Sequence, residues 1–115
     1  MRPARATLVP GTLEMLVLKT LSLEPAHGWG ICERIQQLSN GVFSVNQGSL
    51  YPALERLQQR GWITSEWQVT DSNRRARYYK LTKSGQKQLM AEQESWQVAA
   101  RAIDLILSTV QASHV

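Results

Sequence analysis

The side chains best suited to hold a partner are arginines and lysines gathered in one third of this 115-residue chain. Residues 54–87 contain eight basic and three acidic side chains, a net charge of +5, although the whole chain carries only +4. From Ser72 to Ala91 there are six basic residues and no acidic one. Clustered positive charge attracts a polyanion such as a nucleic acid. A solvated face that only keeps the protein soluble is the alternative explanation of the charge taken alone.

The sequence holds no arrangement of side chains that suits catalysis or metal binding. His27 and His114 are the two histidines and Cys32 is the single cysteine, and the three do not have the spacing of metal ligands. A glycine-rich phosphate loop and an evident carboxylate pair are both missing from the sequence. We therefore expect a protein that is not an enzyme and that uses no metal and no cofactor.

Size and apolar content favour one soluble domain. The chain has the length of a single domain, and 43% of its residues are apolar, which is enough for a small core. No uncharged apolar run approaches the length needed to span a membrane. Glu14 and Lys19 interrupt the apolar stretch near the start, so a secretory signal is not expected. The expected location is the cytoplasm, without membrane association.

A short amphipathic helix leads into the basic segment. Leu50, Leu54 and Leu57 recur at helical spacing and predict its buried stripe. The helix is expected to start between residues 46 and 48 and to end before Gly61, because glycine suits the position that follows a helix.

Two more helices and a β-hairpin complete the predicted domain. Periodic apolar residues predict helices near residues 12–24 and 27–38. Residues 62–69 and 76–81 read as strands, joined by a polar loop at residues 70–75. Three helices followed by a hairpin form a winged helix-turn-helix, which is a mainly α fold with a small β-hairpin (α+β).

The first two helices carry local signals of their own. Thr12 is the expected N-cap of the first helix, and His27 is expected to act as a cap rather than as a ligand. Gly28 and Gly30 flank Trp29 in the first turn of the second helix, where glycine is unfavourable. We therefore expect another backbone to approach closely there, and Trp29 to be buried or half-buried.

The end of the chain predicts a helix that packs against another helix. From Thr82 to about Val110 it would be roughly 40 Å long, and Leu89, Trp96 and Ile103 recur every seven residues along it. A domain of this size cannot cover the whole stripe, so a second copy of the chain is the simplest partner. A helix that folds back on its own domain is the alternative. The expected dimer interface consists of Leu89, Trp96, Ala100, Ile103, Ile106, Leu107 and Val110.

The start of the third helix and the hairpin tip carry the candidate DNA contacts. Gly48 and Pro52 are compact and allow the helix start to sit deep in a major groove, where neighbouring polar side chains reach bases or phosphates. Arginines at the hairpin tip can enter the minor groove or hold phosphates, although the same loop also suits an ordinary solvated turn. The candidate residues are Gln47, Ser49, Tyr51, Arg56, Asn73, Arg74, Arg75 and Arg77.

Four segments together resemble the PadR family of bacterial transcriptional regulators. They are residues 11–18, 27–31, 48–54 and 77–82. The resemblance covers about residues 8–111 and is to the short branch of the family, which has a single C-terminal dimerisation helix. It implies a winged helix-turn-helix DNA-binding domain at residues 8–81 and a dimerisation helix at residues 82–111.

The resemblance also implies a function. Such proteins are sequence-specific regulators, usually repressors, that bind double-stranded DNA at a pseudo-palindromic operator as homodimers and in many cases are released by a small molecule. Ser49 and Tyr51 map onto the recognition helix, and residues 73–75 map onto the wing. Trp96 is the candidate contact for a small aromatic or apolar effector, although an aromatic packing pair at the dimer axis explains it as well. A winged helix that binds RNA or docks onto a protein is the alternative function.

Overall fold

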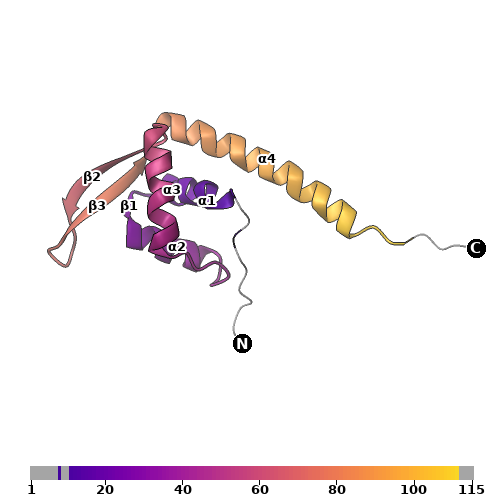
Figure 1. Ribbon diagram of the computed structural model, residues 1–115, viewed down its shortest axis with the longest axis horizontal. Helices are drawn as coiled ribbons and strands as arrows, with labels where there is room; N and C mark the ends of the chain where they lie inside the picture. Colours follow the sequence, from indigo (N-terminus) through magenta and orange to yellow (C-terminus); the bar gives the residue numbers. More distant parts are fainter. Residues whose placement is uncertain (1–7, 9–10, 112–115) are drawn as a thin grey trace, which may run out of the picture.

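The structure, a computed structural model, describes residue 8 and residues 11–111, so that Pro10 and His114 lie outside the described residues. Within these residues it has the expected mainly α fold with a small antiparallel sheet. Figure 1 shows three helices gathered beside the sheet, while the last helix extends away from them. The elements in chain order are α1 (Thr12–Leu23), β1 (Ala26–His27), α2 (Gly28–Leu38), α3 (Gln47–Gln59), β2 (Ile63–Val69), β3 (Arg75–Leu81) and α4 (Lys83–Leu107).

The sheet has a third strand that the sequence does not predict. Ala26 pairs with Tyr79 and His27 pairs with Tyr78, so that β1 lies antiparallel to β3 and the strand order is β1-β3-β2. A two-residue strand has no periodicity of its own and forms only because β3 offers it a free edge. Its effect is to fix the start of α2 against the hairpin.

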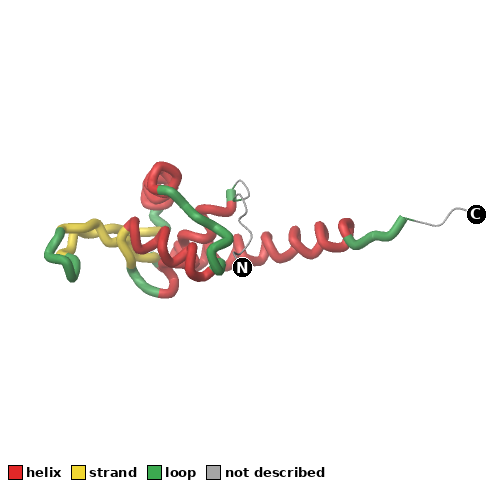
Figure 2. Tube along the Cα trace, turned by 90° about the horizontal axis from the view of Figure 1, so that it is seen from below, coloured by secondary structure: helices red, strands yellow, loops and turns green. Residues whose placement is uncertain are grey.

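The β2–β3 hairpin runs from the core into solvent. At its base Ile63 pairs with Leu81 and is 1% exposed, whereas at its far end Val69 pairs with Arg75 and is 64% exposed. Figure 2 shows the hairpin at one end of the molecule and α4 leaving at the other. We refer to the outer half of the hairpin, residues 67–77, as the wing.

The core lies where the first three helices meet the base of the hairpin. α1 packs against α2, α3, α4 and β3. Leu89 is 2% exposed and packs within this core, so it has no surface left to offer a second copy. Its predicted place at the dimer interface is therefore wrong, because the first turns of α4 complete the core of their own chain. The buried apolar residues are Val17, Leu18, Leu21, Ile31, Ile35, Leu50, Leu54, Leu57, Ile63, Tyr79 and Leu89.

The predicted bounds of α3 are confirmed, and local chemistry explains them. The Asn46 side chain accepts a hydrogen bond from the Ser49 amide at 2.8 Å and so caps the helix start. Gly61 has φ 76°, in the left-handed region, and the Trp62 amide donates to the Leu57 carbonyl at 3.1 Å across the helix end.

The first two helices differ in part from the prediction. Thr12 is the first residue of α1 and not its cap, a position held by Gly11 at φ 87° without a side-chain cap. Trp29 is 59% exposed rather than buried or half-buried, although Gly28 before it is buried. His27 does cap α2, since its Nδ1 accepts a hydrogen bond from the Gly30 amide at 3.0 Å.

The start of α4 is fastened to the corner between α3 and β2. The Thr82 amide donates to the Trp62 carbonyl at 3.0 Å, and the hydroxyls of Thr82 and Ser84 donate to the Gly61 carbonyl at 2.7 and 3.0 Å. A Cβ at Gly85 would lie 2.0 Å from the Trp62 carbonyl oxygen, so only glycine fits. We call Gly61, Trp62, Thr82, Ser84 and Gly85 the α4 clasp.

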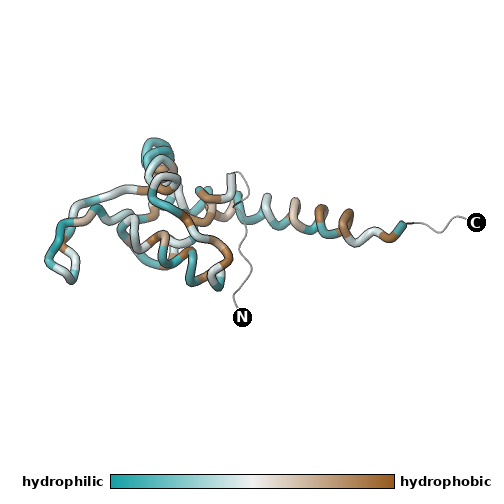
Figure 3. Tube along the Cα trace, turned by 60° about the horizontal axis from the view of Figure 1, so that its bottom comes forward, coloured by the Kyte–Doolittle hydropathy of each residue, from teal (hydrophilic) through white to brown (hydrophobic). Residues whose placement is uncertain are grey.

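The outer half of α4 has little protein around it. It gives the molecule its longest dimension, 72 Å against 37 and 22 Å, and Figure 3 shows apolar residues along its outer turns. Ile103, Ile106 and Leu107 are 52%, 72% and 77% exposed. The helix ends at Leu107, so Val110 lies beyond it and not on the helix as predicted.

Candidate nucleic-acid interface

The start of α3 presents polar side chains to solvent. Gln47, Ser49 and Tyr51 are all exposed and lie in the first two turns, ahead of the buried stripe. The N-terminus of a helix carries partial positive charge and outward-pointing amides, which favour a phosphate oxygen. These three residues are therefore exposed and lie in the positive field of the helix start, as a contact with DNA requires.

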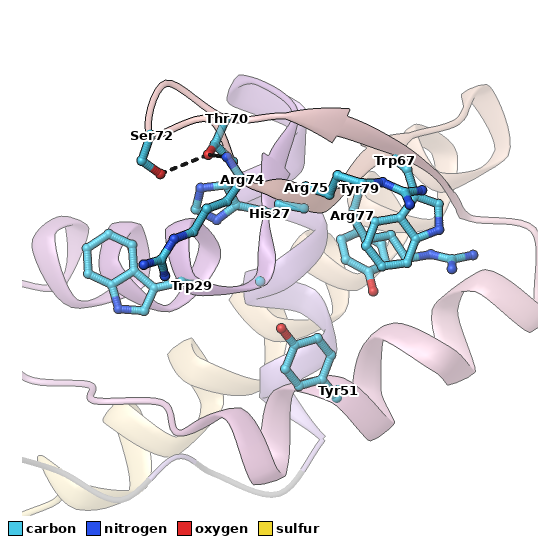
Figure 4. Close-up of a pocket in the computed structure, with 12 residues that line it drawn as sticks. His27, Trp29, Tyr51, Trp67, Thr70, Ser72, Arg74, Arg75, Arg77 and Tyr79 are labelled. Carbon is cyan, nitrogen blue, oxygen red and sulfur yellow. Dashed lines mark hydrogen bonds between the residues drawn. The ribbon is translucent and has the colours of Figure 1, made fainter.

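Tyr51 points from α3 toward the start of α2. A Cβ at Gly28 would lie 2.6 Å from the Tyr51 hydroxyl oxygen, so glycine is needed for this side chain to fit. The close approach expected at this glycine is thus made by a side chain and not by a backbone. Tyr51 is still 46% exposed, and Figure 4 shows its hydroxyl pointing away from α3.

The tip of the wing is an ordered turn. The Asn73 amide donates to the Thr70 carbonyl at 2.9 Å, and the Thr70 amide donates to the Arg74 carbonyl at 2.7 Å. Asn73 has φ 59°, a left-handed conformation that asparagine tolerates well. The hydroxyls of Thr70 and Ser72 are hydrogen-bonded at 3.0 Å. This turn holds Arg74 in the loop and starts β3 at Arg75.

Two arginines of β3 stack on an indole of β2. Trp67 pairs with Arg77, and the next residue on the same face of β2, Val69, pairs with Arg75. The guanidinium carbons of Arg75 and Arg77 lie 5.1 and 5.7 Å from the centre of the Trp67 ring, which is within cation–π range.

A groove of about 630 Å³ separates the start of α3 from the wing. Figure 4 shows aromatic side chains along it, with arginines reaching in from the wing. We call it the wing groove; its walls are His27, Gly28, Trp29, Tyr51, Trp67, Thr70, Ser72, Arg74, Arg75, Ala76, Arg77 and Tyr79.

The wing groove is positively charged and not neutralised by acids. Within the described part of the chain, no carboxylate forms an ion pair with Arg74, Arg75 or Arg77. Arg56 differs from them, because its Nε donates to a carboxylate oxygen of Glu14 at 2.6 Å. This candidate does not line the groove and ties α3 to α1; its side chain is 52% exposed, and its role as a DNA contact stays a prediction.

Tyr79 adds a hydroxyl to the floor of the wing groove. Burial raises the pKa of this hydroxyl above its ordinary value; the charge of Arg77 opposes the shift and the neighbouring Tyr51 adds to it. The Tyr79 hydroxyl therefore stays protonated at neutral pH.

Comparison with known proteins identifies the fold and its use. The sequence model of the transcriptional regulator PadR-like family matches residues 17–91. The crystal structure of a PadR-family transcriptional regulator from Eggerthella lenta is 32% identical, covers 87% of this chain and 85% of its own, and superposes with a TM-score of 0.73. The chain belongs to the PadR-like family of transcriptional regulators. It is a DNA-binding regulator and not an enzyme, which confirms both expectations.

Named relatives of this PadR-like chain share parts of it. The transcriptional regulator Rv3488 of Mycobacterium tuberculosis is 35% identical over 68 residues, which are 59% of this chain and 63% of that protein. The transcriptional regulator YqjI of Escherichia coli is 33% identical over 54 residues, which are 47% of this chain and 26% of that protein. Among the described residues of the chain, none of the helices has the length and apolar character to cross a membrane.

Sequence reasoning missed four aromatic residues of this PadR-like interface, which are His27, Trp29, Trp67 and Tyr79. His27 and Trp29 reach the wing groove because the short strand β1 brings the start of α2 beside the hairpin. Trp67 reaches it because β2 continues beyond the core, which leaves its inner face open. The alternation of β2 did place Trp67 on the face of Ile63; its exposure depends on where the core ends, which a sequence does not show.

Tyr51→Phe is expected to weaken duplex binding by about 1 kcal/mol, because the variant keeps the ring against Gly28 and loses one hydrogen bond to a phosphate. A fluorescence anisotropy titration with a labelled operator measures the change. Tyr78→Phe is the matched control, since Tyr78 is not among the residues of the wing groove and should bind as the unmodified protein does. Equal affinity of both variants would assign Tyr51 to packing alone.

Proposed function

We propose that the protein binds a pseudo-palindromic operator as a homodimer, with α3 in the major groove and the wing over the neighbouring backbone and minor groove. The observation that carries the proposal is the wing groove, in which three arginines without acidic partners among the described residues face the start of α3. One phosphate strand of a duplex would run along this groove, because it separates the helix from the wing. The protein acts on chromosomal DNA, and we therefore place it in the cytoplasm.

The two sides of the wing groove have different tasks in this proposal. Gln47 and Ser49 read base edges, because they stand exposed in the first turn of α3. Tyr51 donates to a phosphate. Asn73 and Arg74, at the tip of the wing, contact the minor groove or the phosphates beside it. Residues 8–81 form the DNA-binding unit, and residues 82–111 supply the dimerisation helix.

The outer half of α4 supports the homodimer. Trp96 and Ile103 are partly exposed in the single chain and recur at seven-residue spacing, and residues 101–107 of α4 are all exposed. A second α4 buries the same side chains on both copies, which satisfies two-fold symmetry. The interface residues that remain after removal of Leu89 are Trp96, Ala100, Ile103, Ile106, Leu107 and Val110.

Repression with release by a small molecule completes the proposal. A dimer on a promoter excludes polymerase by occupancy alone and needs no further activity. A cavity of about 260 Å³ between the start of α1 and α4 is lined by Met15, Glu92 and Trp96, among others. Within the described residues, Oε2 of Glu92 is buried and has no hydrogen-bond partner. These features suit a small aromatic or apolar effector that carries one hydrogen-bond donor.

The double variant Arg74→Ala/Arg75→Ala is expected to weaken binding to every duplex sequence. Two lost phosphate contacts reduce the slope of log K against log salt by about 1.8. Titrations of the operator and of an unrelated duplex at several salt concentrations measure both effects. The control Arg34→Ala/Arg101→Ala removes the same charge from α2 and α4 and should leave the slope unchanged.

A nucleic-acid comparison separates the proposal from its alternative. A gel shift with duplex DNA and with structured RNA at the same salt concentration should show tighter binding of DNA. The variant Arg74→Ala/Arg75→Ala should bind the duplex more weakly than the unmodified protein does. Unchanged DNA affinity in that variant at every salt concentration, or a preference for RNA, would remove the assignment of the wing groove.

A further inference from the structure

We propose that Trp67 is a positioning residue, whose indole holds Arg75 and Arg77 in place for a phosphate strand in the wing groove. The proposal rests on the proposed DNA-binding function and adds a residue that acts through its two neighbours. In this role Trp67 does not contact the duplex directly.

The geometry is that of one aromatic platform with two cations. Trp67 is 56% exposed on the face of β2 that lines the groove. Arg77 is its cross-strand partner and Arg75 is the next residue on the same face of β3, so the ladder itself brings both guanidinium groups onto the ring, at 5.7 and 5.1 Å. A large apolar indole is usually buried; the cation–π contacts with the two arginines stabilise Trp67 in its exposed position.

A tryptophan orders these arginines without cancelling their charge. A carboxylate in the same place would fix a guanidinium by an ion pair and would then compete with phosphate for it. The ring quadrupole attracts the cation and leaves its N–H donors free. Arginine also loses considerable rotamer freedom when it is fixed, so fixing it before DNA arrives reduces the entropy lost on binding.

A hydrogen-bonded chain links this platform to the recognition helix. Nε of Arg77 donates to the Ser65 hydroxyl at 2.7 Å, and that hydroxyl donates to the Gln58 side chain of α3 at 3.0 Å. Arg77 is therefore held by β2 at two points, the hydroxyl and the indole. The distance between α3 and the cations of the wing is thereby set in the free protein.

The test is a double-mutant cycle on operator affinity in low salt. Trp67→Leu is expected to weaken binding about ten-fold, and Trp67→Phe about three-fold or less, because phenylalanine keeps a weaker cation–π surface. In an Arg75→Ala/Arg77→Ala background, Trp67→Leu should change affinity less than about two-fold. The salt slope should stay unchanged in Trp67→Leu, because the charges remain. An equal loss in both backgrounds, or no rescue by phenylalanine, would overturn the proposal.

A measurement without DNA separates this inference from the proposed function. The Nε–Hε NMR signals of Arg75 and Arg77 in the free protein should show ring-current shifts that disappear in Trp67→Leu, while the melting temperature stays close to that of the unmodified protein. Ordinary arginine shifts in the unmodified protein would overturn the positioning role even if operator binding is strong. Shifted arginine signals in a protein that binds no duplex would instead overturn the proposed function, while the contact of Trp67 with the two arginines would be confirmed.

Discussion

Ile103→Asp is expected to separate the proposed homodimer into single chains. Ile103 is 52% exposed in the isolated chain, so the substitution leaves the core of each copy intact. At a two-fold seam it buries an unpaired carboxylate from each copy, which should raise the dimer dissociation constant at least about 100-fold. Sedimentation velocity over a range of concentrations measures the change.

Loss of the proposed dimer should also weaken operator binding. Two linked DNA-binding units gain avidity of about 100-fold or more over one unit, so Ile103→Asp should bind a full operator no better than a half-site. Leu105→Asp is the matched control: Leu105 is 72% exposed but lies on the other side of α4, about 200° around the helix from Ile103. An intact dimer in Ile103→Asp, or equal dissociation in both variants, would contradict the seam.

Gly85→Ala is expected to lower the free energy of unfolding by about 3 kcal/mol, because the added methyl overpacks a site with no room. Its Cβ would meet the Trp62 carbonyl oxygen at 2.0 Å, and that atom is backbone that already accepts the Thr82 amide. Either α4 moves away from the corner or the hydrogen bond breaks. Urea unfolding followed by circular dichroism measures the loss.

Gly48→Ala is the control for this substitution. Gly48 also lies in the first turn of a helix, and its Cβ would meet the Asn46 side chain at 3.3 Å, a contact that a small movement relieves. Alanine is the better helix former, so the stability of this variant should stay within about 1 kcal/mol of the unmodified protein. A stability loss at Gly85 no larger than that at Gly48 would show that the contact with the Trp62 carbonyl does not decide the result.

Elements whose ends are set by neighbouring residues could be predicted from the sequence. Asn46 and Gly61 determine the start and end of α3 through contacts within a few residues, and Thr82 caps α4 in the same way. The exposed positions of Gln47 and Ser49 follow from that start and from the apolar stripe of α3. The arginines of the wing are predictable as a cluster for the same reason, because the hairpin turn is local.

Features that depend on contacts between distant segments could not be predicted. β1 exists because it meets β3, far along the chain, and Arg56 is occupied because Glu14 of α1 comes beside it. Leu89 follows the same seven-residue spacing as Trp96, yet Leu89 is 2% exposed within the core and Trp96 is 41% exposed. Periodicity identifies an apolar face, but which neighbour covers each turn of it is decided by the fold.

The α4 clasp makes α4 a lever. Gly61 and Trp62 join α3 to β2 and hold the first turn of α4. A change in the direction of α4 at this turn therefore also moves α3 and the wing. Over the roughly 37 Å of this rod, a tilt of about 5° moves the far end by about 3 Å. In the proposed homodimer, the angle at which the two copies of α4 cross therefore sets the distance between the two DNA-binding units. Substitutions at that crossing should change the preferred spacing of operator half-sites, whereas substitutions in the wing should leave it constant.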